Sequence, residues 1–265
     1  MTAGLMQGKR GLVMGVANDH SIAWGIAQAL AAQGAELAFT YQGEAFGKRV
    51  EPLAKSVGSD ILLPCDVEDI STVDAVFDAL KAKWGKIDFL VHAIAFSDKN
   101  ELKGKFADTS RENFSKTMVI SCFSFVEISK RAAAMMPDGG SIITLTYGGS
   151  TRVMPNYNVM GVAKAALESA VRYLAGDYGP QGIRVNAISA GPMRTLAGAG
   201  IGDARAMFNY QAAHAPLRRT ITLEEVGGAG LYLLSPLSSG VTGEIHYVDS
   251  GYNIISMPRP DELKA

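Results

Sequence analysis

Short apolar runs alternate with longer segments of helical periodicity along almost the whole chain. The runs have the length and the aliphatic character of strands, and they cover residues 10–16, 36–41, 61–65, 87–94, 141–146, 183–189 and 244–248. Helical patterns lie between them, over residues 21–33, 47–57, 71–84, 109–136, 157–175 and 224–234. Apolar strands that alternate with helices are typical of a parallel sheet covered on both faces. The sequence therefore predicts an α/β fold, in which one doubly wound domain over residues 1–265 holds a seven-stranded parallel sheet with helices on both faces.

Two details complete this prediction. Ser71 stands where the helix over residues 71–84 would begin, and serine is a preferred N-cap residue. Residues 190–215 lose clear periodicity and are rich in alanine and glycine, so we expect an irregular insertion there. The chain has no linker and no internal repeat, which favours a single domain.

Composition and charge exclude several classes of protein. The 265 residues carry a formal net charge of −1, which gives no electrostatic footprint for nucleic acid. No apolar run approaches the ~20 residues of a membrane span, so we expect no integral membrane segment. Cys65 and Cys122 lie far apart and form no CxxC motif, which indicates a reducing cytoplasm. The four histidines have no metal-ligand spacing, so we expect no metal site.

Glycine makes up 29 of the 265 residues, and two glycines fall in the first strand-to-helix turn, where open α/β sheets bind ligands. Gly15 would let the chain turn sharply off the strand, and Gly25 would let the helix lie close to the sheet. The start of the helix near Ser21 would present backbone N–H groups to a pyrophosphate. The turn is not G-x-G-x-x-G, because Asn18 and Ser21 occupy the middle positions. A glycine-tolerant turn without a ligand therefore remains the alternative.

The residues at the ends of the next strands indicate which dinucleotide cofactor, NAD or NADP, such a turn would bind. A carboxylate at the end of the second strand usually binds the ribose of NAD, and an arginine there accommodates the phosphate of NADP. This chain has Gln42, whose amide can hydrogen-bond an unphosphorylated ribose, and its nearest cations, Lys48 and Arg49, lie further on. We therefore expect NADH rather than NADPH. Asp66 follows the third strand and Ile94 ends the fourth, where the adenine and a ribose would lie.

The strongest chemical signal is the pair Tyr157 and Lys164, which lie about two turns apart on one helix. A nearby ammonium and an oxidised nicotinamide would both favour the phenolate of Tyr157 and lower its pKa. Such a pair can donate a hydrogen bond or a proton to an oxygen that gains charge during hydride transfer. The alternative is a half-buried tyrosine beside a surface lysine, but the dinucleotide-type turn favours the chemical interpretation.

A chain with these features resembles the short-chain dehydrogenase/reductases, with the usual Y-x-x-x-K spacing widened. The wider spacing, together with Gly15, Ser21 and Ile22, is similar to the divergent branch, the NADH-dependent enoyl-acyl carrier protein reductases of bacterial fatty-acid synthesis. Further matching stretches are residues 36–42, 155–161, 184–192 and 194–197, and the similarity runs from about residue 8 to residue 255.

The resemblance implies a reaction and its catalytic residues. The expected reaction is the NADH-dependent reduction of the trans-2,3 double bond of an enoyl thioester, in the last step of the fatty-acid elongation cycle. Tyr157 and Lys164 match the catalytic pair of the family. Tyr147 matches the family's second active-site tyrosine, although a strand-end aromatic that only lines a pocket remains an alternative.

The resemblance also implies binding residues. Residues that match cofactor contacts of the family are Gly15, Ser21, Ile22, Gln42, Asp66, Val67, Ile94, Lys164, Met193, Arg194, Thr195, Leu196 and Ala197. Residues expected to contact the substrate are Ala95, Phe96, Ser97, Tyr147 and Tyr157. The family commonly has a glycine after the isoleucine that ends the fourth strand. Here the added methyl of Ala95 would narrow the pocket beside the nicotinamide.

The small and partly apolar stretch at about residues 195–210 suggests a substrate-binding lid, whose ordering would exclude water. A plain surface loop is the alternative, but it would expose Leu196, Ile201, Met207 and Phe208.

Two other functions are compatible with the same fold. A carbonyl reductase of the same superfamily would normally carry a serine about 13 residues before the tyrosine, where this chain has Thr144. A non-catalytic dinucleotide sensor would keep the fold for binding alone, but the intact pair of Tyr157 and Lys164 argues against it.

The resemblance further implies partners and an assembly. Acyl carrier protein would deliver the enoyl thioester, and Arg194, Arg205, Arg218 and Arg219 are either contacts for this acidic carrier or ordinary surface charges. The last predicted strand, residues 244–251, resembles the strand that commonly packs across a subunit interface of the family, so we expect a homotetramer in the cytoplasm.

Overall fold

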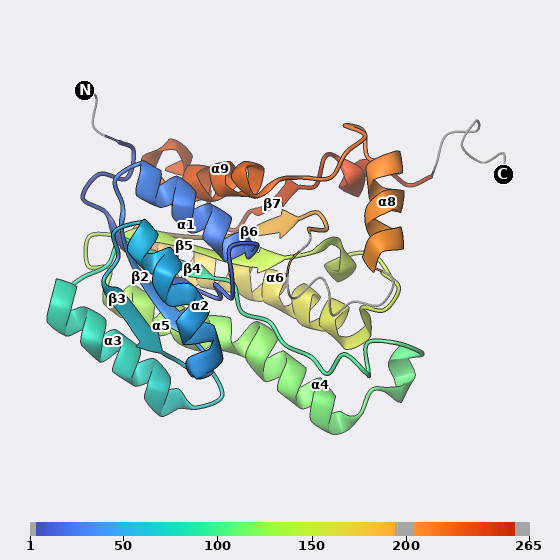
Figure 1. Ribbon diagram of the computed structural model, residues 1–265, viewed down its shortest axis with the longest axis horizontal. Coiled ribbons are helices and arrows are strands. Elements are labelled where there is room, and N and C mark those ends of the chain that lie inside the picture. Colours follow the sequence, from blue (N-terminus) through green and yellow to red (C-terminus); the bar gives the residue numbers. More distant parts are fainter. Residues whose placement is uncertain (1–3, 194, 196–203, 258–265) are drawn as a thin grey trace.

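Seven strands form one parallel sheet in the computed structural model, which describes residues 4–193, 195 and 204–257 (Figure 1). The strands are β1 (Arg10–Met14), β2 (Glu36–Tyr41), β3 (Ile61–Pro64), β4 (Phe89–His92), β5 (Gly140–Thr146), β6 (Ile183–Ala190) and β7 (Ile245–Val248). Their order across the sheet is β3-β2-β1-β4-β5-β6-β7, and neighbouring strands are parallel. The predicted seven-stranded parallel sheet is confirmed.

The winding direction of the chain reverses between β1 and β4. β1 pairs with β2 on one side and with β4 on the other, so that Leu12 lies between Ala38 and Leu90. Ligands of open α/β sheets bind beyond the carboxyl ends of the strands at such a reversal. This topology places the expected site beyond Met14 and His92, where the two strands end.

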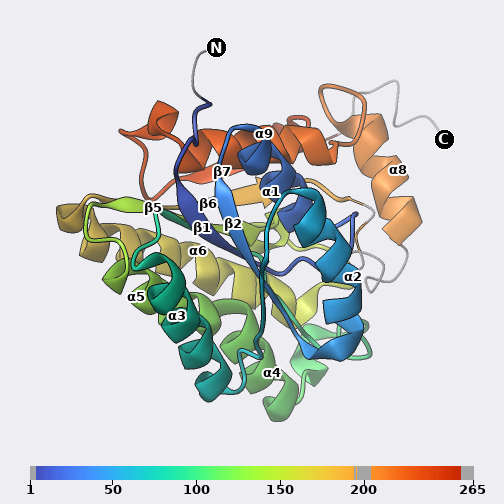
Figure 2. The ribbon, with the colours of Figure 1, turned by 60° about the vertical axis from the view of Figure 1, so that its left-hand side comes forward.

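Helices cover both faces of the sheet (Figures 1 and 2). The helices α1 (Ile22–Ala32), α2 (Gly43–Ser56) and α9 (Leu223–Leu234) pack on one face. The other face carries α3 (Ile70–Trp84), α4 (Arg111–Met118), α5 (Ser124–Ala134) and α6 (Asn158–Tyr178). Each layer has its own apolar core, and β4 between them is buried along its whole length. No helix in the described part of the chain is long and apolar enough to cross a membrane.

Two glycines allow α1 and α9 to pack with their backbones in close approach. A Cβ atom on Gly25 would lie 2.7 Å from the carbonyl oxygen of Leu223, at the start of α9. A Cβ atom on Gly227 would lie 2.5 Å from the carbonyl oxygen of Gly25. Both distances are shorter than any tolerated contact, so only glycine fits at these two positions. The expectation that Gly25 lets the helix lie close to the sheet is wrong, because the backbone that this glycine approaches belongs to the helix α9.

Helix α3 starts one residue earlier than expected, and the prediction that Ser71 caps it is wrong. The N-cap is Asp69, whose Oδ1 accepts a hydrogen bond from the backbone N–H of Ser71 at 3.0 Å. The hydroxyl of Ser71 donates to the same carboxylate at 2.6 Å. Aspartate and serine are both good N-cap residues, and the sequence did not decide between them.

Two further segments differ from the expected pattern. The helix expected over residues 109–136 is interrupted by a π-helical segment, η2 (Val119–Phe123), between α4 and α5. The region expected to be irregular contains the helix α8 (Ala204–His214). Short 3-10 turns complete the fold, namely η1 (Phe106–Asp108), η3 (Gly148–Ser150), η4 (Gly179–Gln181), η5 (Pro236–Ser238) and η6 (Tyr252–Ile254).

Candidate active site

A cavity of about 450 Å³ opens beyond the carboxyl ends of the central strands. Its wall comes from the ends of β4, β5 and β6, from α6 and from α8. Sequence-predicted residues in this wall are Ile22, Ile94, Ala95, Phe96, Ser97, Tyr147, Tyr157, Lys164, Met193 and Thr195. The structure thus brings together the residues expected to bind the nicotinamide and the substrate.

Tyr157 and Lys164 both line this cavity, and both are buried. Tyr157 is the N-cap residue of α6 and is 7% exposed, and Lys164 lies two turns along the helix at 6% exposure. The Nζ atom of Lys164 donates a hydrogen bond to the carbonyl oxygen of Leu145, at the end of β5, over 2.8 Å. Strand β5 therefore fixes the lysine against the cavity wall.

The pKa of Tyr157 is raised, in contrast to the lowering expected from a nearby ammonium together with an oxidised nicotinamide. Burial raises the pKa of Tyr157, and the nearby Tyr147 and Glu168 raise it further. Burial lowers the pKa of Lys164 to about 8, against the opposing influence of Cys122 and Glu168. At neutral pH Tyr157 is therefore a neutral phenol, which suits a hydrogen-bond donor, and Lys164 carries its charge.

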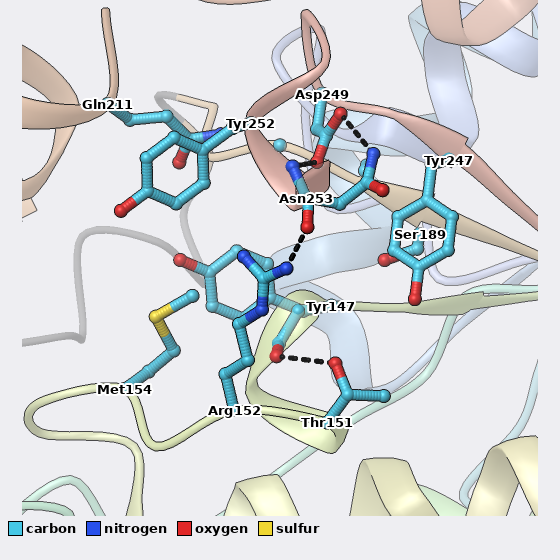
Figure 3. Close-up of a pocket in the computed structure, with 13 residues that line it drawn as sticks. Tyr147, Thr151, Arg152, Met154, Ser189, Gln211, Tyr247, Asp249, Tyr252 and Asn253 are labelled. Carbon is cyan, nitrogen blue, oxygen red and sulfur yellow. Dashed lines mark hydrogen bonds between the residues drawn. The ribbon is translucent and has the colours of Figure 1, made fainter. Parts of the chain in front are cut away.

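Tyr147 lies against Tyr157 in an edge-to-face contact, with 5.1 Å between the ring centroids. Burial and the neighbouring Tyr252 raise the pKa of Tyr147 to about 12, so it is also protonated at neutral pH. Behind Tyr147 lies a second, smaller pocket of about 40 Å³, where Arg152 donates to the carbonyl oxygen of Asn253 (Figure 3). Tyr147 thus separates the large cavity from this polar pocket.

The turn after β5 holds Tyr157 in place through backbone that comes very close to its ring. A Cβ atom on Gly149 would lie 2.4 Å from Cδ1 of Tyr157. A Cβ atom on Gly161, one turn along α6, would lie 2.8 Å from the carbonyl oxygen of Gly149. Both glycines let η3 lie directly on the start of α6, so they fix the position of the tyrosine ring.

The first strand-to-helix turn has the geometry that a pyrophosphate requires. Gly15 adopts a positive φ of 96°, and a Cβ atom there would lie 2.0 Å from the carbonyl oxygen of Ala93. The hydroxyl of Ser21 accepts hydrogen bonds from the N–H groups of Ala17 and Asn18, at 3.0 and 3.1 Å, and so closes the turn. The N–H groups of Trp24 and Gly25 donate to the carbonyl oxygen of Ser21, so the N–H groups of Ile22 and Ala23 are those at the start of α1 that suit an anion.

Gln42 and Asp66 meet at the ends of β2 and β3, although 24 residues separate them. The Nε2 atom of Gln42 donates to Oδ2 of Asp66 over 3.0 Å. The backbone N–H of Asp66 donates to Thr72 Oγ1 at 2.9 Å, which holds the following turn, including Val67. The carboxylate of Asp66 and the amide of Gln42 can hydrogen-bond the hydroxyl groups of a ribose. Neither side chain is positively charged, so this pair does not suit the 2′-phosphate of NADP.

The wall at residues 95–97 is held by polar side chains of the helix beneath it. The hydroxyl of Ser121 accepts from the N–H of Phe96 and donates to its carbonyl oxygen, both at 3.0 Å. Ser97 contacts the hydroxyl of Thr117 at 2.9 Å and the side chain of Asn113. This part of the wall therefore has a fixed backbone next to Ala95.

These residues fit a nicotinamide dinucleotide. The buried ammonium of Lys164 has three donors, and Leu145 accepts one of them. The remaining donors face a cavity whose rim reaches Ile22 at the start of α1. In the described part of the chain, no three histidine, cysteine, aspartate or glutamate side chains gather as metal ligands would.

Residues 15–253 match the profile of the family described as Enoyl-(Acyl carrier protein) reductase. The chain belongs to this family. The enoyl-acyl carrier protein reductase (NADH) 2 of Rhizobium meliloti is 76% identical over 98% of this chain and 97% of its own length. The crystal structure of FabI from Candidatus Liberibacter asiaticus has a TM-score of 0.95 at 61% identity, and it covers 97% of this chain and 100% of that one. The enoyl-acyl carrier protein reductase of Anaplasma phagocytophilum, solved in complex with NAD, has a TM-score of 0.94 at 56% identity over 97% of this chain and 98% of that one.

The predicted membership of the enoyl-acyl carrier protein reductases is thereby confirmed, and with it the predicted class of reaction and the use of NADH. Thr144, at the position where a carbonyl reductase carries its serine, is buried and donates to the carbonyl oxygen of His92 at 3.1 Å. Its hydroxyl also contacts Nδ1 of His92 at 3.2 Å, so it is already engaged inside the protein. The Thr144 hydroxyl therefore does not take the place of a catalytic serine that faces a substrate.

Some functional residues escaped the sequence analysis, and some expected ones cannot be placed. Arg194, Leu196 and Ala197 lie outside the described residues, as does Ile201 of the expected lid. Met207 and Phe208 of α8 do line the cavity, next to Leu102 and Met160, which the sequence analysis did not single out. Leu102 packs in one apolar cluster with Tyr157 and Met160, and nothing in its sequence neighbourhood signals that contact.

Proposed function

We propose that Tyr157 and Lys164 carry the NADH-dependent reduction of the trans-2,3 double bond of enoyl thioesters on acyl carrier protein. The observation that carries this proposal is that both side chains are buried and line the same cavity at the carboxyl ends of β4, β5 and β6. A dinucleotide-type turn at Gly15 lies at the neighbouring strand, so a cofactor held there would reach the same cavity.

Tyr157 acts as the hydrogen-bond donor to the thioester oxygen. The dihydronicotinamide, when bound, supplies a hydride to the β-carbon, and negative charge then develops on that oxygen. A phenol can donate a hydrogen bond only while it is protonated, and the raised pKa of Tyr157 keeps it protonated at neutral pH. A well-placed donor of this kind contributes about 2.7–4 kcal/mol of transition-state stabilisation. The α-carbon is protonated afterwards.

Lys164 holds the cofactor and supplies positive charge. Its ammonium is fixed by Leu145 on one side, and its remaining donors suit the hydroxyl groups of the nicotinamide ribose. With a pKa of about 8 it is charged at pH 7, in a buried place where charge acts strongly. Tyr147 forms the edge of the site beside Tyr157, and we assign it to the substrate pocket with a supporting role in catalysis.

The remaining residues divide between cofactor and substrate. We assign the pyrophosphate to the turn of Gly15, Ser21 and Ile22 and the adenosine to Gln42, Asp66 and Val67, while Ile94, Met193, Arg194, Thr195, Leu196 and Ala197 serve the nicotinamide end. The substrate contacts Ala95, Phe96 and Ser97. The stretch at about residues 195–210 acts as a lid over the acyl chain, and residues 1–265 form one catalytic domain.

The decisive experiment replaces Tyr157 by phenylalanine. We expect Tyr157→Phe to lower kcat with NADH and a crotonyl thioester by at least about 10²-fold, because the donor to the thioester oxygen is lost. Fluorescence titration should show that NADH still binds. Tyr178→Phe, which removes a tyrosine hydroxyl at the opposite end of the same helix, is the matched control and should keep the parent rate.

A Tyr157→Phe protein as fast as the parent would refute the assignment. The same assay with a 3-oxo thioester distinguishes the carbonyl reductase, and an absence of turnover with either substrate would point to a dinucleotide sensor.

The wider setting is part of the same proposal. Acyl carrier protein delivers the substrate, the enzyme works in the cytoplasm, and it assembles as a homotetramer. Exposed apolar side chains on the outer helices, such as Val119 and Phe123 beside α4 and α5 and Tyr173 on α6, support an assembly of several copies.

A further inference from the structure

Helix α6 buries a second charged side chain, Glu168, one turn beyond Lys164. Glu168 is 5% exposed and Lys164 is 6% exposed. Among the residues that the structure describes, no other lysine, arginine, aspartate or glutamate is buried. Charged side chains are almost never buried without a partner. Glu168 and Lys164 lie four residues apart on one face of α6, so one structural reason should explain why both charges are buried.

Two consecutive residues of β5 hold these two charges. Leu145 accepts the hydrogen bond of Lys164 at 2.8 Å, and Thr146 donates its hydroxyl to Oε1 of Glu168 at 2.6 Å. A distance of 2.6 Å is typical of a hydroxyl that donates to a carboxylate. Tyr147 follows directly and lines the cavity. Three consecutive residues at the end of β5 therefore bind Lys164, bind Glu168 and form part of the cavity wall.

We propose that Glu168, held by Thr146, is a positioning residue that keeps Lys164 charged and fixed beside the cavity during the reaction. The inference rests on the proposed role of Lys164. Glu168 itself touches neither substrate nor cofactor in this scheme, because its carboxylate acts through the neighbouring ammonium.

The other groups that face Lys164 do not supply a negative charge at neutral pH. Cys122 approaches from η2, and burial raises the pKa of its thiol, so it stays neutral. His92 approaches from β4, and burial and Lys164 lower its pKa to about 3, so it is also neutral. Tyr157 remains a phenol. Glu168 is thus the carboxylate that opposes the desolvation of Lys164, whose pKa burial lowers to about 8.

The test is the pH profile of Glu168→Gln, a variant of the same shape that can still accept the hydrogen bond of Thr146. Loss of the negative charge should lower the pKa of Lys164 further, so the alkaline limb of kcat/KM should move down by about one pH unit. The expected result is a loss of about fivefold at pH 8 and almost none at pH 6. Glu112→Gln, which removes an exposed carboxylate from α4, should keep the parent profile.

A second variant keeps the test decisive if Glu168→Gln is unstable. Thr146→Val releases the carboxylate without removing its charge, so the alkaline limb should move in the same direction by a smaller amount. If either folded variant loses activity equally at all pH values, Glu168 is a purely structural residue and the inference is wrong. The role of Tyr157 would survive that result, because the Tyr157→Phe assay leaves Glu168 and Lys164 unchanged.

Discussion

The position of the catalytic tyrosine depends on residues that have no side chain at all. Gly149 comes so close to Tyr157 that a methyl group would lie 2.4 Å from its ring, whereas at Gly148 the nearest atom would be Cε of Met154 at 3.5 Å. Neighbouring glycines in one 3-10 turn thus differ in what they permit. Of these two neighbours, Gly149 is the one that constrains the ring of Tyr157.

This difference gives a prediction with a built-in control. Gly149→Ala should push the ring of Tyr157 aside and lower kcat by about 10²-fold, because small displacements of a catalytic group are costly. NADH affinity, measured by fluorescence titration, should change little. Gly148→Ala adds the same methyl group in ordinary van der Waals contact and should keep the parent kcat. Equal losses of kcat in the two variants would show that any alanine in this turn lowers activity, and that the contact of Gly149 with Tyr157 is not the cause.

Among the single residues, the sequence predicted those whose spacing follows a known motif. It missed those whose role depends on a contact with a residue that is distant in the sequence. Tyr157 and Lys164 could be predicted, because their separation places both on one helix. Glu168 could not, since a glutamate on a helix usually faces solvent, and only the structure shows that it is 5% exposed and hydrogen-bonded to Thr146. The direction of the pKa of Tyr157 was mispredicted for a related reason, because its burial and the neighbouring Tyr147 and Glu168, which raise this pKa, are visible only in the structure.

Among the elements, strand positions could be predicted closely and helix interruptions could not. Strands are apolar on both faces here, so their ends show as changes in polarity, and β2 (Glu36–Tyr41) has the bounds expected from the sequence. The π-helical segment η2 leaves no such mark, because it adds a residue without changing the apolar pattern. Helix α8 was missed because its sequence is rich in alanine and lacks a strong apolar stripe.

The packing of α1 on α9 gives a prediction for two adjacent glycines. Gly227 faces the backbone of Gly25, so Gly227→Ala should force the helices apart and cost about 1–3 kcal/mol of unfolding free energy. Gly228 is exposed and has open space where a Cβ would lie, so Gly228→Ala should stabilise the protein by about 0.5–1 kcal/mol. Chemical denaturation of the two variants measures the change in the free energy of unfolding, which should be a decrease for Gly227→Ala and an increase for Gly228→Ala. Destabilisation by Gly228→Ala would mean that its exposed face is covered in the assembled protein.

In the molecule as a whole, the reversal of winding between β1 and β4 explains why distant segments share one site. Strand ends separated by most of the chain meet at one edge of the sheet, so Gly15, Ile94 and Tyr147 lie around the same region. This convergence could be predicted from the alternation of strands and helices alone. The contacts between side chains at that edge, such as Gln42 with Asp66, required the structure.

The helices α4, α5 and α6 lie on one side of the sheet (Figure 2), and exposed aromatic side chains stand on this side. Phe123 is 50% exposed and Tyr173 is 76% exposed. Large exposed aromatic side chains on packed helices are typical of surfaces that bind another protein. If the proposed homotetramer uses this surface, a charge placed there should weaken the assembly.

Phe123→Arg should therefore reduce the mass measured by size-exclusion chromatography with light scattering, from that of a tetramer towards that of smaller species. Ile70→Arg adds the same charge at an exposed apolar residue at the start of α3 and should leave the mass unchanged. Because Phe123 lies next to Cys122 and thus close to Lys164, the loss of assembly should also lower activity at high dilution. A Phe123→Arg protein that keeps the parent mass would place the subunit contact elsewhere, with β7 as the next surface to test.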